Sequence, residues 1–272
     1  MDFTSNQSSK HQNKKNPSNP KKIEKIDLKQ QTKHSIVEYI KSFDLSISSK
    51  LPREEELAKM LGVSRITLRS VLDDLAADGM IFRIHGKGTF INPQFFTMKA
   101  SFNPVIHFFD MIRNSGYTPS VKLLSSLIEP APHEVSKKLN LSPEEQVFAL
   151  EKIFLADNKL CAFTKDYIPM KYLQDVDLKE ANNFHYSLFY FLYEATGRKI
   201  TWDQVELNAV SLQEVPILQK LKKEFPSNTS GYLLLKGINY DENNEACLYA
   251  TEYIDTTVLK FNQIRKRIFD FP

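Results

Sequence analysis

The chain has 272 residues, of which 42% are apolar and 25% are charged, and its net charge is +3. This length suits two domains of ordinary size, and the apolar content excludes a wholly disordered or collagen-like chain. Its two cysteines exclude a disulfide framework or a common four-ligand zinc site, and its six histidines show no metal-ligand spacing. No run of about 20 apolar residues predicts a membrane span. We expect a cytoplasmic protein without metal or cofactor.

Positive charge is concentrated at the N-terminal end of the chain. Residues 1–33 carry eight lysines against three acidic residues, and residues 1–32 are rich in Asn, Ser, Gln, Lys and Pro. We therefore expect a disordered basic tail over 1–32. Such a tail fits contact with a nucleic acid, and it equally fits a solvated segment without a partner.

Residues 33–92 predict a winged helix-turn-helix domain. Three segments place apolar residues at helical spacing, and Ser64 is a residue type that caps the start of a helix. A glycine-rich turn then joins two short apolar segments, as in a two-stranded β wing. The expected elements are helices over 33–43, 52–61 and 64–77 and wing strands over 80–84 and 89–91.

The third of these helices predicts a DNA-reading surface. Its core positions are Leu68, Val71, Leu72 and Leu75, which follow helical spacing. Arginines and an isoleucine lie on the other side, and they suit a major groove because arginine reaches guanine or phosphate and isoleucine meets a thymine methyl. An ordinary surface helix is the alternative, and it leaves an exposed Ile66 unexplained. The predicted DNA-binding residues on this basis are Arg65, Ile66, Thr67, Arg69 and Ser70, with His85 in the wing.

The remainder of the chain predicts a second domain of the α+β class. Residues 93–103 read as a partly packed linker, and residues 104–272 mix helical and strand patterns. Tight turns at 157–158 and 241–244 favour a largely antiparallel sheet over a parallel one. The expected helices are 104–114, 132–139, 186–196 and 213–223, and the expected strands are 119–129, a hairpin over 146–168, 200–211, 231–239 and 246–255.

The segment LPREEELAKMLGVSRITLRSVLDDLAADGMI, followed by HGKGTFI, resembles the DNA-binding domain of the GntR family of bacterial transcription regulators. The resemblance implies a winged helix-turn-helix. It also implies DNA contacts from Ser64 and from the wing residues Gly86, Lys87, Gly88 and Thr89. Glu55 stands where the family has a DNA-contacting arginine, so that contact is either lost or taken over by Arg53.

The rest of the chain resembles the UTRA effector-binding domain of the HutC branch of that family, which implies a chorismate-lyase-like α+β fold. The resemblance rests on IEPAPHEVSKKLNLSPEEQVFALEKIFLADNKLCAFTKDYIP, SLFYFLYEATGRKI and ACLYATEYIDTT. It implies an effector pocket at Lys152, Phe154, Thr164, Ser187, Phe189 and Tyr253. Phe154 and Ile254 replace common family arginines and Thr164 replaces a carboxylate. We therefore expect a less charged and more apolar pocket than a phosphosugar site, because it lacks a bidentate arginine fork.

The function expected from these features is that of a ligand-responsive regulator of transcription. A homodimer would repress at a two-fold symmetric double-stranded DNA operator and leave it when a small-molecule effector binds. The effector would be sugar-derived or partly apolar and not clearly a phosphate. One alternative is a constitutive DNA binder with a degenerate pocket. Another is an enzyme, because the fold is lyase-like, but the sequence offers no catalytic residues.

Overall fold

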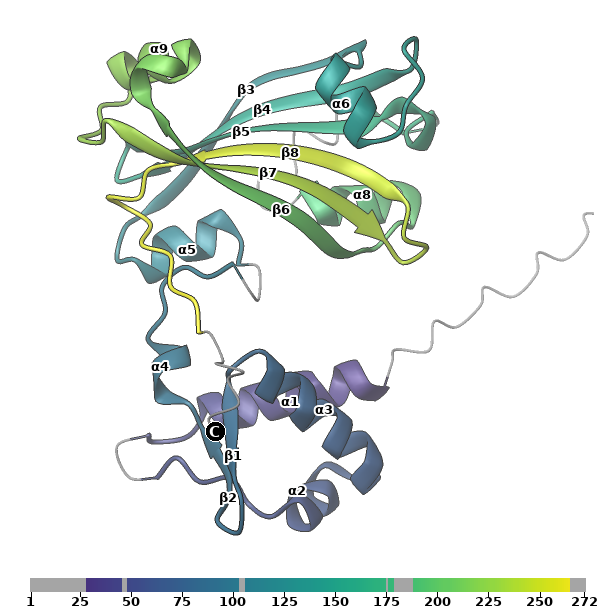
Figure 1. The fold of residues 1–272 in the computed structure, drawn as a ribbon, viewed down its shortest axis with the longest axis vertical. Coiled ribbons are helices and arrows are strands. Elements are labelled where there is room, and N and C mark those ends of the chain that lie inside the picture. The colour runs from purple at the N-terminus through teal and green to yellow at the C-terminus, as the bar shows by residue number, and fades with distance from the viewer. Residues whose placement is uncertain (1–27, 46–47, 103–105, 175, 179–187, 265–272) are drawn as a thin grey trace, which may run out of the picture. The chain divides into compact units, whose positions relative to one another are not determined.

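The computed structural model describes residues 28–45, 48–102, 106–174, 176–178 and 188–264 (Figure 1). The chain divides into two compact units, which are described separately below. The first unit runs to Leu75 and includes Arg83–Ile91, and the second holds Ala76–Phe82 and the chain from Asn92 onward. Within the described ranges, no helix has both the length and the apolar character needed to cross a membrane.

The N-terminal region is the predicted winged helix-turn-helix. Gly62 ends the second helix with a left-handed φ of 66°, which glycine adopts without strain, and its N–H donates to the Lys59 carbonyl at 3.3 Å. Ser64 caps the third helix, because its Oγ accepts the Thr67 N–H at 3.1 Å. The elements are α1 (Leu28–Lys41), α2 (Glu54–Leu61), α3 (Arg65–Ala77), β1 (Ile81–Ile84) and β2 (Gly88–Ile91).

Helix α1 begins at Leu28, five residues earlier than expected. The expected tail over 1–32 was therefore too long, and its residues 1–27 lie outside the described part of the chain. The extra turn is held by Thr32, which is buried and donates its hydroxyl to the Leu28 carbonyl at 2.7 Å. Lys29 adds an ion pair with Asp74 of α3 at 2.7 Å. The burial of Thr32 and the ion pair between Lys29 and α3 thus order a stretch whose polar composition favours disorder.

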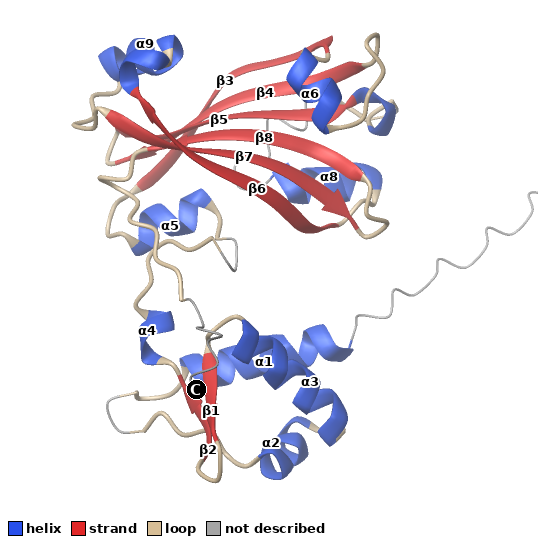
Figure 2. Cartoon of the chain, in the orientation of Figure 1, coloured by secondary structure: helices blue, strands red, loops and turns tan. Residues whose placement is uncertain are grey.

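The C-terminal unit is an α+β domain, as predicted, built on a six-stranded sheet in which all paired strands are antiparallel (Figure 2). The strand order is β3-β4-β5-β8-β7-β6. The strands are β3 (Pro119–Pro130), β4 (Gln146–Ala156), β5 (Lys159–Pro169), β6 (Ile200–Ser211), β7 (Gly231–Asp241) and β8 (Ala246–Ile254). The described α-helices are α4 (Pro93–Phe96), α5 (Phe108–Asn114), α6 (His133–Lys138), α8 (Leu188–Thr196) and α9 (Pro216–Glu224).

Helices cover both faces of this sheet (Figure 1). Helices α6 and α9 pack on one face, where Val135 and Leu218 meet strand residues such as Ile153 and Tyr249. Helices α5 and α8 pack on the other face, where Met111 and Phe191 meet its apolar residues. Successive side chains of a strand point to opposite faces of the sheet. Because both faces are covered, the even-numbered and the odd-numbered residues of the central strands are both buried.

Helix α9 begins at Pro216 and not near residue 213, as expected. The preceding residues Leu212–Glu214 form a 3-10 turn closed by a capping box, in which the Glu214 carboxylate accepts the Ser211 N–H at 2.6 Å. Proline suits the first turn of a helix because its missing N–H has no partner there in any case. The turn and the proline together set the start of α9.

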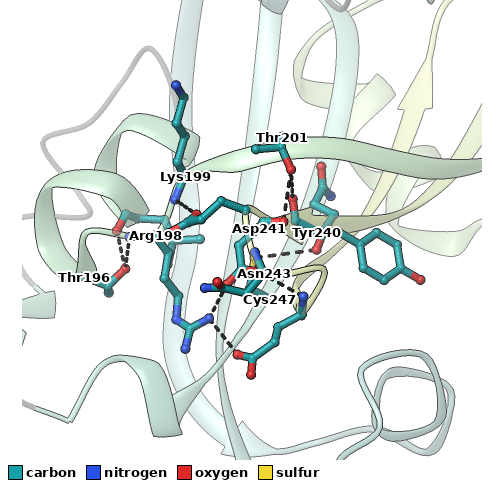
Figure 3. A network of polar contacts seen from close by, with 12 residues as sticks. Thr196, Arg198, Lys199, Thr201, Tyr240, Asp241, Asn243 and Cys247 are labelled. Atoms are coloured by element: carbon teal, nitrogen blue, oxygen red, sulfur yellow. Dashed lines mark hydrogen bonds and ion pairs between the residues drawn. The ribbon is translucent and has the colours of Figure 1, made fainter. Parts of the chain in front are cut away.

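An ion pair between Arg198 and Asp241 joins the segment just before β6 to the end of β7 (Figure 3). Asp241 is fully buried, and its carboxylate accepts the N–H groups of Asn243 and Glu245 at 2.9 and 3.0 Å and a hydrogen bond from Arg198. Burial alone would raise the pKa of Asp241. These donors outweigh burial and hold the pKa below its usual value. Because the charges of Asp241 and Arg198 are paired within this network, we assign it a role in stabilising the fold.

Candidate functional site

The outer side of α3 carries exposed side chains of mixed chemistry. Ile66 is 84% exposed, the largest exposed fraction among the large exposed hydrophobic residues of the described chain. Arg65 and Arg69 beside it are also exposed. The four core positions expected on the other side, Leu68, Val71, Leu72 and Leu75, are each at most 1% exposed. The spacing therefore assigned the two faces of this helix correctly.

A chain of ion pairs fixes the base of this surface. The Glu54 carboxylate of α2 lies 3.2 Å from Arg69 Nη2 of α3 and 3.6 Å from Arg83 Nη2 of β1. Arg83 also pairs with Asp73 of α3 at 2.5 Å. Glu54 thus holds the guanidinium group of Arg69, while the side chain of Arg69 remains exposed. Arg83 was not predicted to belong to this surface, because nothing in the wing sequence shows that its side chain faces α2 and α3.

The other predicted DNA-binding residues are spread over the start of α2, the start of α3 and the wing. Ser64 is occupied by its capping bond, and Thr67 and Ser70 are partly buried. In the wing, residues 85–88 are exposed, and the turn is closed by the Lys87 N–H donating to the Ile84 carbonyl at 3.0 Å. Within the described ranges, the exposed Arg53 and Arg65 have no ion-pair partner and are available to an anion.

A second candidate site lies inside the C-terminal unit, on the sheet face that α5 and α8 cover. A cavity of about 350 Å³ is bounded there by side chains of β4, β5, β8, β7 and β6 and by residues of the two helices. This volume falls in the range of small-molecule sites, roughly 300–1,000 Å³. Its strand residues share one face because their registers align, as in the row Lys152, Thr164, Glu252 and Leu235 across four strands.

Four of the six predicted effector-binding residues line this cavity: Lys152, Phe154, Thr164 and Phe189. Ser187 lies outside the described residues. Tyr253 is not among the lining residues, because the odd-numbered positions of β8 point to the opposite face, where its ring stacks on Phe163 at 5.9 Å. The residue that β8 turns toward the cavity at this point is its neighbour Glu252.

The expectation of a weakly charged cavity was wrong, because three carboxylates line it. They are Asp166, Asp203 and Glu252, which come from β5, β6 and β8. Lys152 and His107 are the basic side chains among the lining residues. Burial, followed by repulsion from Asp166 and Asp203, raises the pKa of Glu252 to about 8. Thr164 does replace a family carboxylate, but Asp166, two residues along the same face, supplies one.

Metal binding finds no support in the part of the chain that the structure describes, where no group of three or more His, Cys, Asp or Glu side chains has a suitable arrangement. The two cysteines, Cys161 and Cys247, are buried and unpaired.

One unit is thus a winged helix-turn-helix with an exposed, arginine-bearing helix, and the other unit contains a cavity of the size of a metabolite. This combination defines a class of DNA-binding regulators that carry a ligand-binding domain. Residues 28–91 match the gntR family of bacterial regulatory proteins, and residues 114–259, more than half of the chain, match the UTRA domain. The chain belongs to the GntR-type regulators that carry a UTRA domain.

Curated relatives agree with this assignment. The chain is 32% identical over 147 residues to the uncharacterized HTH-type transcriptional regulator YurK of Bacillus subtilis, a match covering 54% of this chain and 60% of that protein. It is 24% identical over 213 residues to the HTH-type transcriptional repressor NagR of the same species, covering 78% of this chain and 83% of that one. Both relatives are named as regulators of transcription, and neither as an enzyme.

A solved structure shows the same fold. The possible transcriptional regulator YydK of Bacillus subtilis superposes with a TM-score of 0.68 at 17% identity, covering 88% of this chain and all of that one.

Proposed function

We propose that this protein is a ligand-responsive repressor of the HutC branch, which binds a DNA operator through its N-terminal unit and leaves it when a small molecule fills the cavity of the C-terminal unit. The observation that carries the proposal is the pairing of an exposed arginine-bearing recognition helix with a cavity of about 350 Å³ in one chain. A cavity of this size favours a responsive regulator over a constitutive DNA binder with a degenerate pocket.

The DNA contacts follow from the exposed residues of α3 and the wing. Arg65 and Arg69 would reach base edges or phosphates in the major groove, and Ile66 would meet a thymine methyl. Lys87 and His85 at the wing tip lie where a phosphate or the minor groove would pass. Arg53, at the exposed start of α2, would substitute for the family arginine that Glu55 replaces.

The protein would act as a homodimer, because a single recognition helix reads only a few base pairs and a two-fold symmetric operator presents two half-sites. The effector would then change the relation between the two DNA-binding units of the dimer, so that both half-sites could no longer be occupied together. The coupling between effector and DNA would have the usual size, about 1–3 kcal/mol.

The proposal is tested by selecting binding sites for the full chain from random DNA and footprinting the result. A two-fold symmetric site, bound with a specific affinity that Arg65→Ala weakens, supports it. Binding that shows no sequence preference at physiological salt contradicts it. The matched control is Arg113→Ala, an exposed arginine on α5 of the C-terminal unit that pairs only with its helix neighbour Asp110 among the described residues.

A further inference from the structure

The charged groups of the cavity come from four strands and converge on one face of the sheet. Lys152 of β4 lies opposite Thr164 of β5, and Thr164 lies opposite Glu252 of β8. Asp166 follows two residues along β5, so it is a diagonal neighbour of Glu252 on the same face. Asp203 projects from β6 at the exposed side of the cavity. Three carboxylates thus surround one volume.

The single lysine of the cavity is already neutralised. Lys152 Nζ lies 3.2 Å from Asp166 Oδ2, and the two side chains are only 13% and 9% exposed. The Thr164 hydroxyl donates to the same Asp166 oxygen at 3.5 Å. An incoming anion would have to displace Asp166 from Lys152, and it would leave a buried carboxylate without its counter-ion, which is costly.

Two carboxylates remain without a basic partner. In the described part of the chain, neither Glu252 nor Asp203 forms an ion pair with a lysine, arginine or histidine. Glu252 is partly buried in the cavity wall, between Thr164 of β5 and Leu235 of β7. A carboxylate in such a place is stabilised by a positively charged hydrogen-bond donor, and none of the described residues supplies one.

The remaining walls suit the apolar body of a ligand. Phe108 of α5 stacks on Phe154 of β4 with their ring centroids 4.8 Å apart, and Met111 and Ile254 lie in the same cluster. Aromatic ring faces attract cations as well as apolar groups, so these walls add to the preference that the carboxylates create.

We propose that the cavity binds an organic cation, whose ammonium group pairs with Glu252 and is attracted by the charge of Asp203 on the same cavity, and whose apolar part lies against Phe154 and Phe108. This inference rests on the proposed function, in which the cavity is the effector site. A phosphorylated sugar is disfavoured at the same site, because its charge would face Asp166 and Asp203, and Lys152, the lysine among the lining residues, is already paired with Asp166.

The test uses the full chain and calorimetry with matched compounds. Butyl, cyclohexylmethyl, phenethyl and indolylethyl skeletons are each compared as the amine, the alcohol and the carboxylic acid, with glucose 6-phosphate as the sugar-phosphate probe. We expect at least one amine to bind 10-fold or more tightly than its alcohol, with no measurable binding of acids or of glucose 6-phosphate. Preference for an acid or the sugar phosphate, or an absence of binding by every amine, would overturn the proposal.

Two variants locate the interaction. Glu252→Gln keeps the size of the side chain and should weaken amine binding at least 10-fold, whereas Glu206→Gln should leave it unchanged. Glu206 is the matched control because it is an exposed carboxylate of β6 that does not border the cavity. Asp203→Asn, at the exposed side of the cavity, provides a second removal of charge if Glu252→Gln disturbs folding. Unaltered amine affinity in both cavity variants would also overturn the proposal.

Operator binding is measured separately, so that the two ideas can fail independently. Amine binding without any change in operator affinity would contradict the proposed regulatory role and leave the cation site standing. Release of the operator by glucose 6-phosphate and not by any amine would refute the cation site and leave the regulator standing.

Discussion

Replacing Ile66 by alanine should alter which DNA sequence this protein prefers while leaving its fold intact. The side chain is 84% exposed and packs on little of its own domain, so its loss should change the free energy of unfolding by less than about 0.5 kcal/mol. On DNA, the substitution removes three carbon atoms. At ~0.8 kcal/mol per buried methylene, half-burial of these atoms against a thymine methyl corresponds to ~1 kcal/mol, or about a 5-fold loss at one base pair.

The assay is selection from a randomised operator with the wild-type protein and with Ile66→Ala in parallel. Sequence preference should relax at one position of each half-site, while the salt dependence of binding stays the same because no charge is removed. The control is Leu28→Ala, another apolar residue of the same region that is 54% exposed but lies on α1. An identical preference at every position for wild type and Ile66→Ala would refute the assigned orientation of α3.

Arg65→Ala should weaken operator binding by about 1–3 kcal/mol with unchanged circular dichroism, and wild-type affinity would argue against its contact. Deleting residues 1–27, which carry six lysines, should flatten the salt dependence of DNA binding without changing operator preference, whereas an equal slope would mean that the tail does not touch DNA. Arg198→Ala removes the cationic partner of the buried Asp241 and should lower the free energy of unfolding, measured by urea denaturation, by about 2–4 kcal/mol. A loss under ~1 kcal/mol would contradict a stabilising role for this ion pair. The pKa of Glu252 is raised to about 8, so its carboxyl group is largely protonated below that pH. The carboxyl group must lose this proton to pair with an ammonium group, so amine affinity should rise toward pH 8 and level off above it. Calorimetry in buffers of different ionisation enthalpy checks this proton release, and a pH-independent affinity would contradict it.

The helices of the N-terminal unit were predictable because their sequence signals are local. A 3.6-residue repeat of leucine and valine defines the buried side of α3, and Ser64 marks its start. The start of α1 was not predictable, since Thr32 and Lys29 are held by contacts within the folded domain that a polar sequence does not announce.

The cavity was harder to predict, for a reason that lies in the sheet. Both faces of β8 are covered by helices, so Leu248 on one face and Tyr249 on the other are equally buried. The hydrophobic pattern therefore does not say which face a residue joins, and a displacement of one position exchanges Glu252 for Tyr253. The carboxylates of β5, β6 and β8 are distant in sequence and line the same cavity only because of the strand register.

If filling the cavity releases the DNA, one titration will show it. The affinity of the full chain for its selected, fluorescently labelled operator is measured by anisotropy with and without a saturating amine that calorimetry has shown to bind. We expect operator affinity to fall by about 5- to 150-fold, the range of ordinary allosteric coupling, and to stay unchanged in Glu252→Gln at the same amine concentration. An operator affinity that stays the same while the cavity is occupied would contradict this expectation.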